Sequence, residues 1–220
     1  MPNLPRQFLK TGEGSIASYS FTNLIEGIGG VEFYAGNALD DEASNVNLLS
    51  SQAFYSDSIE IALVATAEES TLISTQTYSL GEAVITNILK GRAIVSFGWG
   101  MRANNNNQGQ SQGYIVARIV ADGVTIGEAK TGTKNSTGTA YTLSAGGQST
   151  LTMDLTETIL KVGDVLSLVL LVYGHKISGA VGGLVMNGTD PQNRDGTYLT
   201  PSSADLTTRI TCMIPFEVRL

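Results

Sequence analysis

Short segments in which apolar and polar residues alternate recur along the whole chain, and glycine-rich or polar turns separate them. Alternation with a period of two places successive side chains on opposite faces of a β-strand, so each segment can bury one side. The 25 glycines among 220 residues suit the many tight turns that such segments need. We therefore predict an all-β protein of roughly ten to twelve short strands, arranged as an antiparallel sandwich or barrel.

Four features carry this prediction most clearly. Arg92–Met101 is apolar and aromatic and is predicted to be a central strand. Asp122-Gly123 lies between two apolar runs, which is a strong signal for a hairpin. Ser149–Leu155 alternates with its leucines and methionine on one side. Pro215 cannot donate a main-chain hydrogen bond, so it predicts a bulge or an edge in the closing strand.

Other stretches are less regular. Asn104–Gly113 is a polar, low-complexity sequence that we predict to be a surface loop, and Asn187–Ala204 is predicted to be the longest loop. Lys130–Gln148 is a second polar stretch, rich in glycine, serine and threonine. Ala83–Leu89 fits a helical stripe as well as a strand, and its β-branched residues and flanking glycines favour a strand.

The formal net charge of −7 is unevenly distributed. Eleven acidic residues and no lysine or arginine lie between Thr11 and Leu89, whereas nine basic residues balance nine acidic ones from Gly100 onward. An acidic surface repels phosphate, so we expect no binding to nucleic acid or to anionic membranes. It suits a basic protein neighbour or a hard cation, and the alternative is a solvated face that keeps an assembly soluble.

The chain has one histidine, His175, and one cysteine, Cys212. A single histidine without a nucleophile signature argues against histidine-centred catalysis and against a multi-histidine zinc site. Cys212 lies in a predicted strand and is expected to be a buried, inert thiol. We therefore expect a protein that is not an enzyme, with no catalytic residues, no cofactor and no metal ligands.

Two further kinds of site stay open as alternatives. Asp40-Asp41-Glu42 and Asp190–Gly196 are clusters of oxygen ligands that a calcium ion prefers, although both lack the remaining positions of a calcium loop. An aromatic platform for a sugar ring could come from a small set of side chains, of which two lie in strands and are expected to pack in the core. The set is Trp99, Tyr114, Tyr141, Tyr173 and Tyr198.

The turn and strand Leu160-Lys-Val-Gly163-Asp164-Val-Leu166-Ser-Leu168 resembles the "Leu-x-x-Gly-Asp-x-Leu-x-Leu" segment of jelly-roll sandwiches. Such segments occur in tumour-necrosis-factor-like domains and in viral capsid and decoration proteins. The resemblance covers about 130 residues of the second half, and it implies an antiparallel jelly-roll β-sandwich. We expect an extended N-terminal arm over residues 1–14 and one jelly-roll-like domain over residues 15–220. The arm contains Pro2 and Pro5, which favour an extended backbone.

The N-terminal residues lack the charged start and apolar run of a secretory signal, and the apolar runs are too short to cross a bilayer. We therefore expect a protein made in the cytoplasm, and the resemblance to viral jelly-roll proteins implies that this is a host cytoplasm and that the protein is found in the virion. Our first hypothesis is a structural protein of a virus particle, a capsid decoration or minor capsid component. It would bind other copies of itself, with a trimer as one expected form, and other virion proteins. The alternative is a receptor- or carbohydrate-binding head of a tail fibre or a similar binding module.

Overall fold

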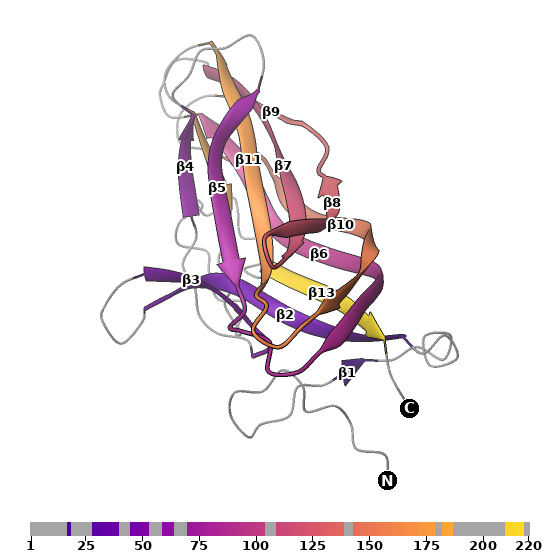
Figure 1. Cartoon of the computed structure of the whole chain (residues 1–220). Helices are drawn as coiled ribbons and strands as arrows, with labels where there is room; N and C mark the ends of the chain where they lie inside the picture. The colour runs from indigo at the N-terminus through magenta and orange to yellow at the C-terminus, as the bar shows by residue number, and fades with distance from the viewer. Residues whose placement is uncertain are drawn as a thin grey trace.

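The computed structural model describes residues 17–18, 28–39, 45–52, 59–63, 70–103, 109–138, 143–178, 182–186 and 210–217. Most of these residues lie in β-strands, and none of them lies in a helix (Figure 1). The predicted all-β class is therefore confirmed. Within the described ranges, no helical segment has the length and apolar character needed to span a membrane.

The strands of the described residues are numbered along the chain. In chain order they are β1 (Ala17–Ser18), β2 (Ile28–Leu39), β3 (Asn45–Ser50), β4 (Ile59–Leu63), β5 (Thr71–Ser79), β6 (Asn87–Ala103), β7 (Gly109–Ala121), β8 (Val124–Lys130), β9 (Lys134–Gly138), β10 (Leu143–Leu160), β11 (Leu166–Ser178), β12 (Gly182–Met186) and β13 (Ile210–Glu217).

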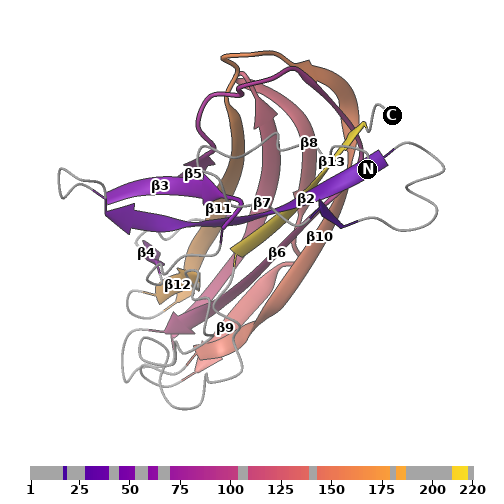
Figure 2. The same ribbon diagram turned by 90° about the horizontal axis from the view of Figure 1, so that it is seen from below.

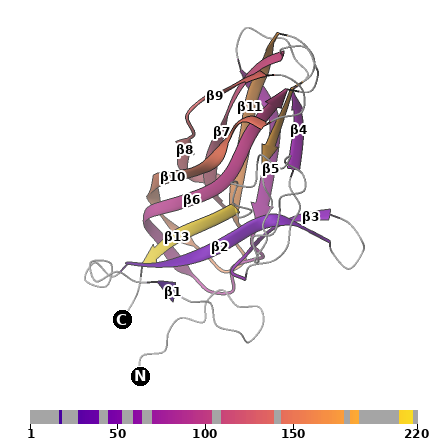
Figure 3. The same ribbon diagram turned by 180° about the vertical axis from the view of Figure 1, so that it is seen from behind.

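Hydrogen-bonded neighbours follow the order β4-β12-β6-β13-β2-β3-β5-β11-β7-β8, with β1 on β2, β10 on β6 and β9 on β7. The paired strands are antiparallel except β3 and β5, which touch in parallel at Leu48 and Ser79. Because β10 also lies close to β8, the sheet curls and nearly closes on itself (Figure 2). The result is two layers around one core. One layer contains β5, β11, β7 and β8, and the other contains β10, β6, β13 and β2 (Figure 3).

The core lies between these two layers and follows the predicted alternation. On β6, Val95, Phe97 and Trp99 are completely buried, while Ile94 and Ser96 on the other side of the strand are partly exposed. The opposite layer contributes the inward side of β11, which is almost entirely leucine and valine. The side of β6 that carries Val95, Phe97 and Trp99 therefore faces the core.

Two predicted turns are present. Asp122 and Gly123 have φ angles of 45° and 79°, the left-handed conformation that a tight hairpin requires at both central positions. At the end of β10, the carboxylate of Asp164 accepts a 2.8 Å hydrogen bond from the amide of Lys161. Gly163, with φ 92°, completes this turn. The chain reversal that precedes β11 is therefore fixed by Gly163 and Asp164.

Two polar stretches of the sequence contain residues that belong to paired strands. β7 begins at Gly109, so part of the predicted loop Asn104–Gly113 is a strand, and residues 104–108 lie outside the described residues. The polar stretch Lys130–Gln148 contains β9 and the start of β10. The physical reason is that β9 pairs with β7 through main-chain groups, which do not require apolar side chains.

Two other local predictions are refined. β6 begins at Asn87, so only the last three residues of the strand predicted for Ala83–Leu89 form it. Ala83 instead exchanges main-chain hydrogen bonds with the turn before β11. Pro215 lies where the pairing of β13 with β6 shifts register, between Met213 and Phe216. The predicted bulge is thus confirmed, and β13 is an interior strand between β2 and β6.

The arm predicted for residues 1–14 and the loop Asn187–Ala204 lie outside the described residues. The jelly-roll order of connections is not established by the pairings and stays a prediction, as does the division into an arm and one domain over residues 15–220.

Candidate interaction surfaces

His175 lies near the end of β11 and is buried. A 2.9 Å hydrogen bond joins its Nδ1 to the Oγ of Ser70, because the pairing of β11 with β5 brings these two strand ends together. A catalytic pair needs a third group that orients the imidazole, and within the described part of the chain no carboxylate contacts this ring. The contact satisfies a buried ring nitrogen.

Cys212 lies on β13 between Phe33 of β2 and Val95 of β6, and it is completely buried. Burial raises the pKa of its thiol, so the thiol stays protonated at neutral pH. The thiolate is the reactive form of cysteine, so a thiol that stays protonated is unreactive. Cys212 is therefore a buried, inert side chain of the core, as the sequence predicted.

The two acidic clusters considered as cation sites, Asp40-Asp41-Glu42 and Asp190–Gly196, lie outside the described residues. Across the ranges that the structure does describe, no three histidine, cysteine, aspartate or glutamate side chains are grouped so that they could hold a metal ion.

The aromatic residues considered as a sugar platform do not come together as one. Trp99 is completely buried, and its Nε1 donates a 2.8 Å hydrogen bond to the Oγ of Ser149. Tyr114 and Tyr173 stack on each other, with ring centroids 4.8 Å apart and planes 10° apart. Lys130 Nζ lies 3.6 Å from the centroid of Tyr114. Because Tyr173 covers one face of Tyr114 and Lys130 covers the other, that ring has no free face for a sugar.

Tyr141 and Tyr198, the other two aromatic residues of that set, lie outside the described residues.

The Tyr114–Tyr173 pair belongs to a larger surface, the outer side of the layer that contains β5, β11, β7 and β8. Residues that pair directly across antiparallel strands share one side of a sheet. The pairings Leu72–Tyr173–Tyr114 and Leu171–Val116–Lys130 therefore place six side chains in two adjacent rows. We call this surface the tyrosine face, and it consists of Leu72, Tyr114, Val116, Lys130, Leu171 and Tyr173.

Of the non-charged members of the tyrosine face only Leu72 is exposed, because Tyr114 and Tyr173 are half-buried and Val116 and Leu171 are buried. Lys130 is its one cation and forms no ion pair with the described residues. Leu72 is 50% exposed, and Lys130 is exposed beside Tyr114. The next row holds an ion pair between Arg118 and Glu128, which adds no net charge. The face therefore combines apolar area with a formal charge of about +1.

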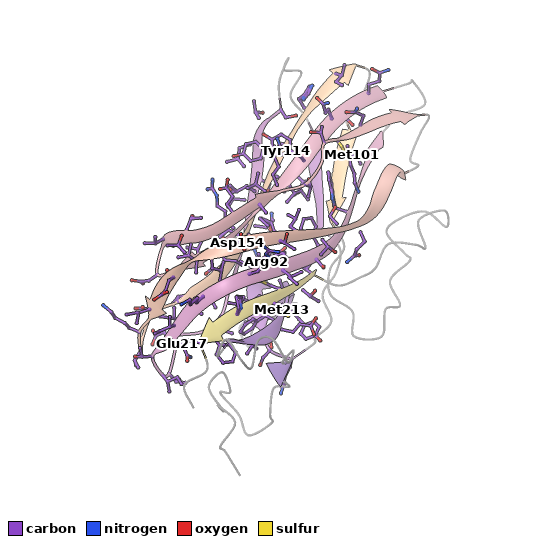
Figure 4. All side chains as sticks on the ribbon, turned by 90° about the vertical axis from the view of Figure 1, so that its right-hand side faces the viewer. Arg92, Met101, Tyr114, Asp154, Met213 and Glu217 are labelled. Atoms are coloured by element: carbon purple, nitrogen blue, oxygen red, sulfur yellow. The ribbon has the colours of Figure 1, made fainter. Side chains whose placement is uncertain are left out.

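The outer side of the other layer is different, because polar pairs cross it. Arg92 and Asp154 form an ion pair of 3.0 Å between β6 and β10, and the two residues lie side by side in Figure 4. A 2.9 Å hydrogen bond joins the hydroxyls of Ser96 and Thr150 two rows further along the same side of these strands. These polar groups are satisfied by their own partners, and the same side of the layer also exposes Ile159, at 56%, beside its cross-strand partner Ile88.

A second apolar surface lies at one end of the molecule. Val84, Val124 and Val162 are 59%, 63% and 65% exposed. They come from three separate connections: the loop between β5 and β6, the hairpin between β7 and β8, and the turn between β10 and β11. We call these three residues, with the loops that carry them, the valine tip.

Main-chain hydrogen bonds tie the three loops of the valine tip together. The amide of Ala83 donates to the carbonyl of Asp164 at 2.9 Å, and the amide of Gly163 donates to the carbonyl of Ala83 at 2.8 Å. The amide of Asp122 donates to the carbonyl of Val165 at 2.9 Å. The exposed valines are thus held on a fixed framework rather than on separate loops.

The valine tip is acidic. Over residues 80–86, 121–124 and 161–165 the charged residues are Glu82, Asp122 and Asp164 against Lys161, which gives −3 + 1 = −2. Its charge is therefore opposite to that of the tyrosine face.

Neither surface was found from the sequence. Val84 and Val162 are far apart along the chain, and Tyr114 and Tyr173 are 59 positions apart (173 − 114), so only strand pairing brings each set together. The one available signal was local: Val124 directly follows the Asp-Gly turn, where an apolar residue has little chance of burial.

No protein-family model matches the chain, and no curated protein sequence matches it. Among solved structures, the chain is similar to a CocE/NonD family hydrolase from Staphylococcus aureus, at 10% identity and a TM-score of 0.48, over 96% of this chain and 40% of that one. It is similar to the carbohydrate-binding module CBM36 in complex with calcium and xylotriose at 18% identity and a TM-score of 0.26, over 61% of this chain and 88% of that one. A structure of infectious bursal disease virus, strain Gx, gives 14% identity and a TM-score of 0.24, over 83% and 42% of the two chains.

The chain therefore spans less than half the length of the hydrolase. The neighbours include a hydrolase, a binding module and a virus structure, so these likenesses do not separate one function from another.

Proposed function

We propose that this chain is a non-enzymatic structural protein of a virus particle, a capsid decoration or minor capsid component that assembles with copies of itself. The observation that carries the assembly part is the tyrosine face. It exposes Leu72 and Lys130 beside the half-buried rings of Tyr114 and Tyr173 on one outer side of the sandwich. Tyrosine side chains are enriched in protein–protein interfaces relative to the rest of a protein surface.

Charge supports association between copies at this surface. The whole chain carries a formal charge of −7, so two copies repel each other on average. The tyrosine face does not share this negative charge. Its one charged residue is Lys130, and in the neighbouring row Arg118 and Glu128 form an ion pair whose charges cancel. Two copies that approach through this surface therefore repel each other less than the charge of −7 on the whole chain implies.

The assignment to a virus particle rests on the resemblance of Leu160–Leu168 to the turn and strand of viral jelly-roll proteins. The structure has the local features of that segment, a Gly163-Asp164 turn followed by β11. Sandwich domains suit shells because their loops gather at the ends of the sheets and are available for contacts between neighbours.

Recognition of a carbohydrate is the alternative. It has less support from the described residues, because Trp99 is buried and both faces of Tyr114 are covered.

The test is the mass of the purified full-length chain in solution, measured by light scattering after size exclusion. We expect a discrete multiple of 23.2 kDa, with a trimer as the leading form, and closed symmetric particles in electron micrographs. A species of 23.2 kDa across micromolar concentrations would contradict self-assembly. A glycan array provides the parallel test, because specific binding to a sugar would favour the alternative.

A further inference from the structure

We infer that the valine tip of one copy docks on the tyrosine face of a second copy, so that the chain assembles head to tail. This inference rests on the self-assembly proposed above and names the two surfaces that make the contact. Both surfaces expose apolar side chains, the three valines of the tip and Leu72 beside the half-buried Tyr114 and Tyr173 of the face, and they differ in position and in charge.

The first argument is electrostatic complementarity. The tip carries −2 from its four charged residues, and the face carries about +1 from Lys130. Contact between two tips brings together charges of the same sign, and contact between two tyrosine faces brings two copies of Lys130 together. Only the pairing of tip with face is attractive, and such complementarity sets both the partner and its orientation.

The second argument concerns shape and rigidity. Main-chain hydrogen bonds fix the three tip loops to one another, so the valines lose little conformational freedom when they are buried. The tyrosine face is equally fixed, because Tyr173 and Tyr114 stack across two paired strands. Two ordered surfaces associate with a smaller entropic cost than mobile loops do.

The third argument concerns symmetry. The tip and the face are different surfaces of one chain, so their contact is heterologous and leaves a free tip and a free face on every dimer. Further copies add through the same contact, and a rotation of 120° between neighbours closes the ring as a trimer without a second kind of interface.

The test is a charge exchange between the two surfaces, measured by sedimentation equilibrium of the full chain. Glu82→Lys combined with Asp122→Asn changes the tip from −2 to +1, and asparagine tolerates the left-handed backbone at position 122. Lys130→Glu changes the face from +1 to −1. We expect each change alone to weaken association by about tenfold or more, and the three substitutions together to restore it.

Lys90→Glu is the matched control, because it makes the same charge change on the other outer face of the sandwich and should leave association unchanged. An uncharged variant, Val84→Ser with Val162→Ser, tests the apolar part and should also weaken association. Both valines are more than half exposed, so the monomer is expected to keep its melting temperature.

The outcomes separate the inference from the proposed function. If the wild-type chain is an oligomer and the tip and face variants associate as it does, the docking inference is wrong while self-assembly stands. If the wild-type chain is a monomer, both are wrong. Binding of the wild-type chain to phosphatidylcholine vesicles that Val84→Ser with Val162→Ser abolishes would assign the tip to lipid and overturn the inference.

Discussion

The side chain of Lys134 lies over the ring of Trp99, with Nζ 4.3 Å from the ring centroid, and donates a 2.9 Å hydrogen bond to the main-chain carbonyl of the same tryptophan. Lys134 is the first residue of β9, and Trp99 lies on β6. Two effects on the ammonium oppose each other. Partial burial removes water and favours the neutral amine, whereas the indole ring and the carbonyl favour the cation. Burial prevails and lowers the pKa of Lys134 to about 8.

This pKa predicts how stability depends on pH. The ordinary pKa of a lysine is 10.5, so between pH 8 and 10.5 the unfolded chain binds more protons at position 134 than the folded chain. The free energy of unfolding therefore rises with pH in this window, and below pH 8 the contribution is constant. Because Lys134 is partly exposed, solvent screening keeps the rise well below the ~1.4 kcal/mol per pKa unit of a fully desolvated group.

Urea denaturation between pH 7 and 10.5 measures this effect, with Lys134→Met as the variant that lacks it. The difference in free energy of unfolding between wild type and variant should change in favour of wild type as pH rises. Equal pH dependence of the two proteins would contradict the lowered pKa.

The same pKa predicts selective acylation of Lys134. At pH 8 about half of the Lys134 amines are neutral, compared with less than about 1% for a lysine of ordinary pKa. Limiting acetic anhydride at pH 8, followed by peptide mass spectrometry, should modify Lys134 at least several-fold faster than the exposed Lys90 and Lys161. A modification rate at Lys134 below that of these two control lysines would show that the amine is shielded or charged.

Removal of the hydroxyl of Tyr78 and removal of the hydroxyl of Ser149 are predicted to change stability in opposite directions. The hydroxyl of Tyr78 is completely buried without a hydrogen-bond partner among the described residues, and desolvation raises the pKa of its phenol. Tyr78→Phe removes an unsatisfied polar group, so it should leave stability unchanged or raise it by about 1 kcal/mol.

Ser149→Ala is the matched substitution, because it removes the acceptor of the Trp99 Nε1 hydrogen bond. It should lower stability by about 1 to 3 kcal/mol, since it leaves a buried indole N–H without a partner. Thermal denaturation of both variants measures the two changes, and a clear loss of stability in Tyr78→Phe would show that its hydroxyl has a partner.

The parts of the fold that were predictable from the sequence are those fixed by neighbouring residues. Asp122-Gly123 specifies its hairpin because both residues tolerate a positive φ, and the alternation of Val95, Phe97 and Trp99 specifies which side of β6 is buried. Strand β9 was missed because its hydrogen bonds come from β7, more than twenty residues earlier in the chain, and not from any apolar pattern of its own.

The candidate site was less predictable than the fold. His175 and Cys212, the residues with the most reactive side chains, were not predicted to form a site, and both are buried in the structure. The valine tip depends on hydrogen bonds between Ala83 and the turn at Gly163, which join segments 80 residues apart (163 − 83). No local pattern encodes such a contact, so an interaction surface of this kind becomes visible only when the strands are paired.

Substitution of Gly113 and of Gly81 by alanine should affect stability differently, because the space around the two residues differs. A Cβ atom on Gly113 would lie 2.8 Å from the main-chain oxygen of Tyr173, and main chain in a paired strand cannot move aside easily. A Cβ atom on Gly81 would meet nothing within 4 Å. Gly113→Ala should therefore lower the free energy of unfolding by about 1 to 3 kcal/mol, while Gly81→Ala should change it by less than about 0.5 kcal/mol. Urea denaturation measures both, and equal stability of the two variants would contradict the close approach of β7 and β11.

The thiol of Cys212 reports on opening of the sandwich. It is completely buried between β2 and β6, and its raised pKa keeps it protonated, so a thiol reagent can react only when β13 separates from its neighbours. With Ellman's reagent at pH 8 in native buffer, we expect negligible labelling over minutes and complete labelling of one thiol in 6 M guanidinium chloride. The labelling rate at intermediate urea should follow the unfolding transition measured by circular dichroism. Rapid labelling of the native chain would mean that β13 opens locally, and it would place the weakest part of the sandwich in the layer that contains β6.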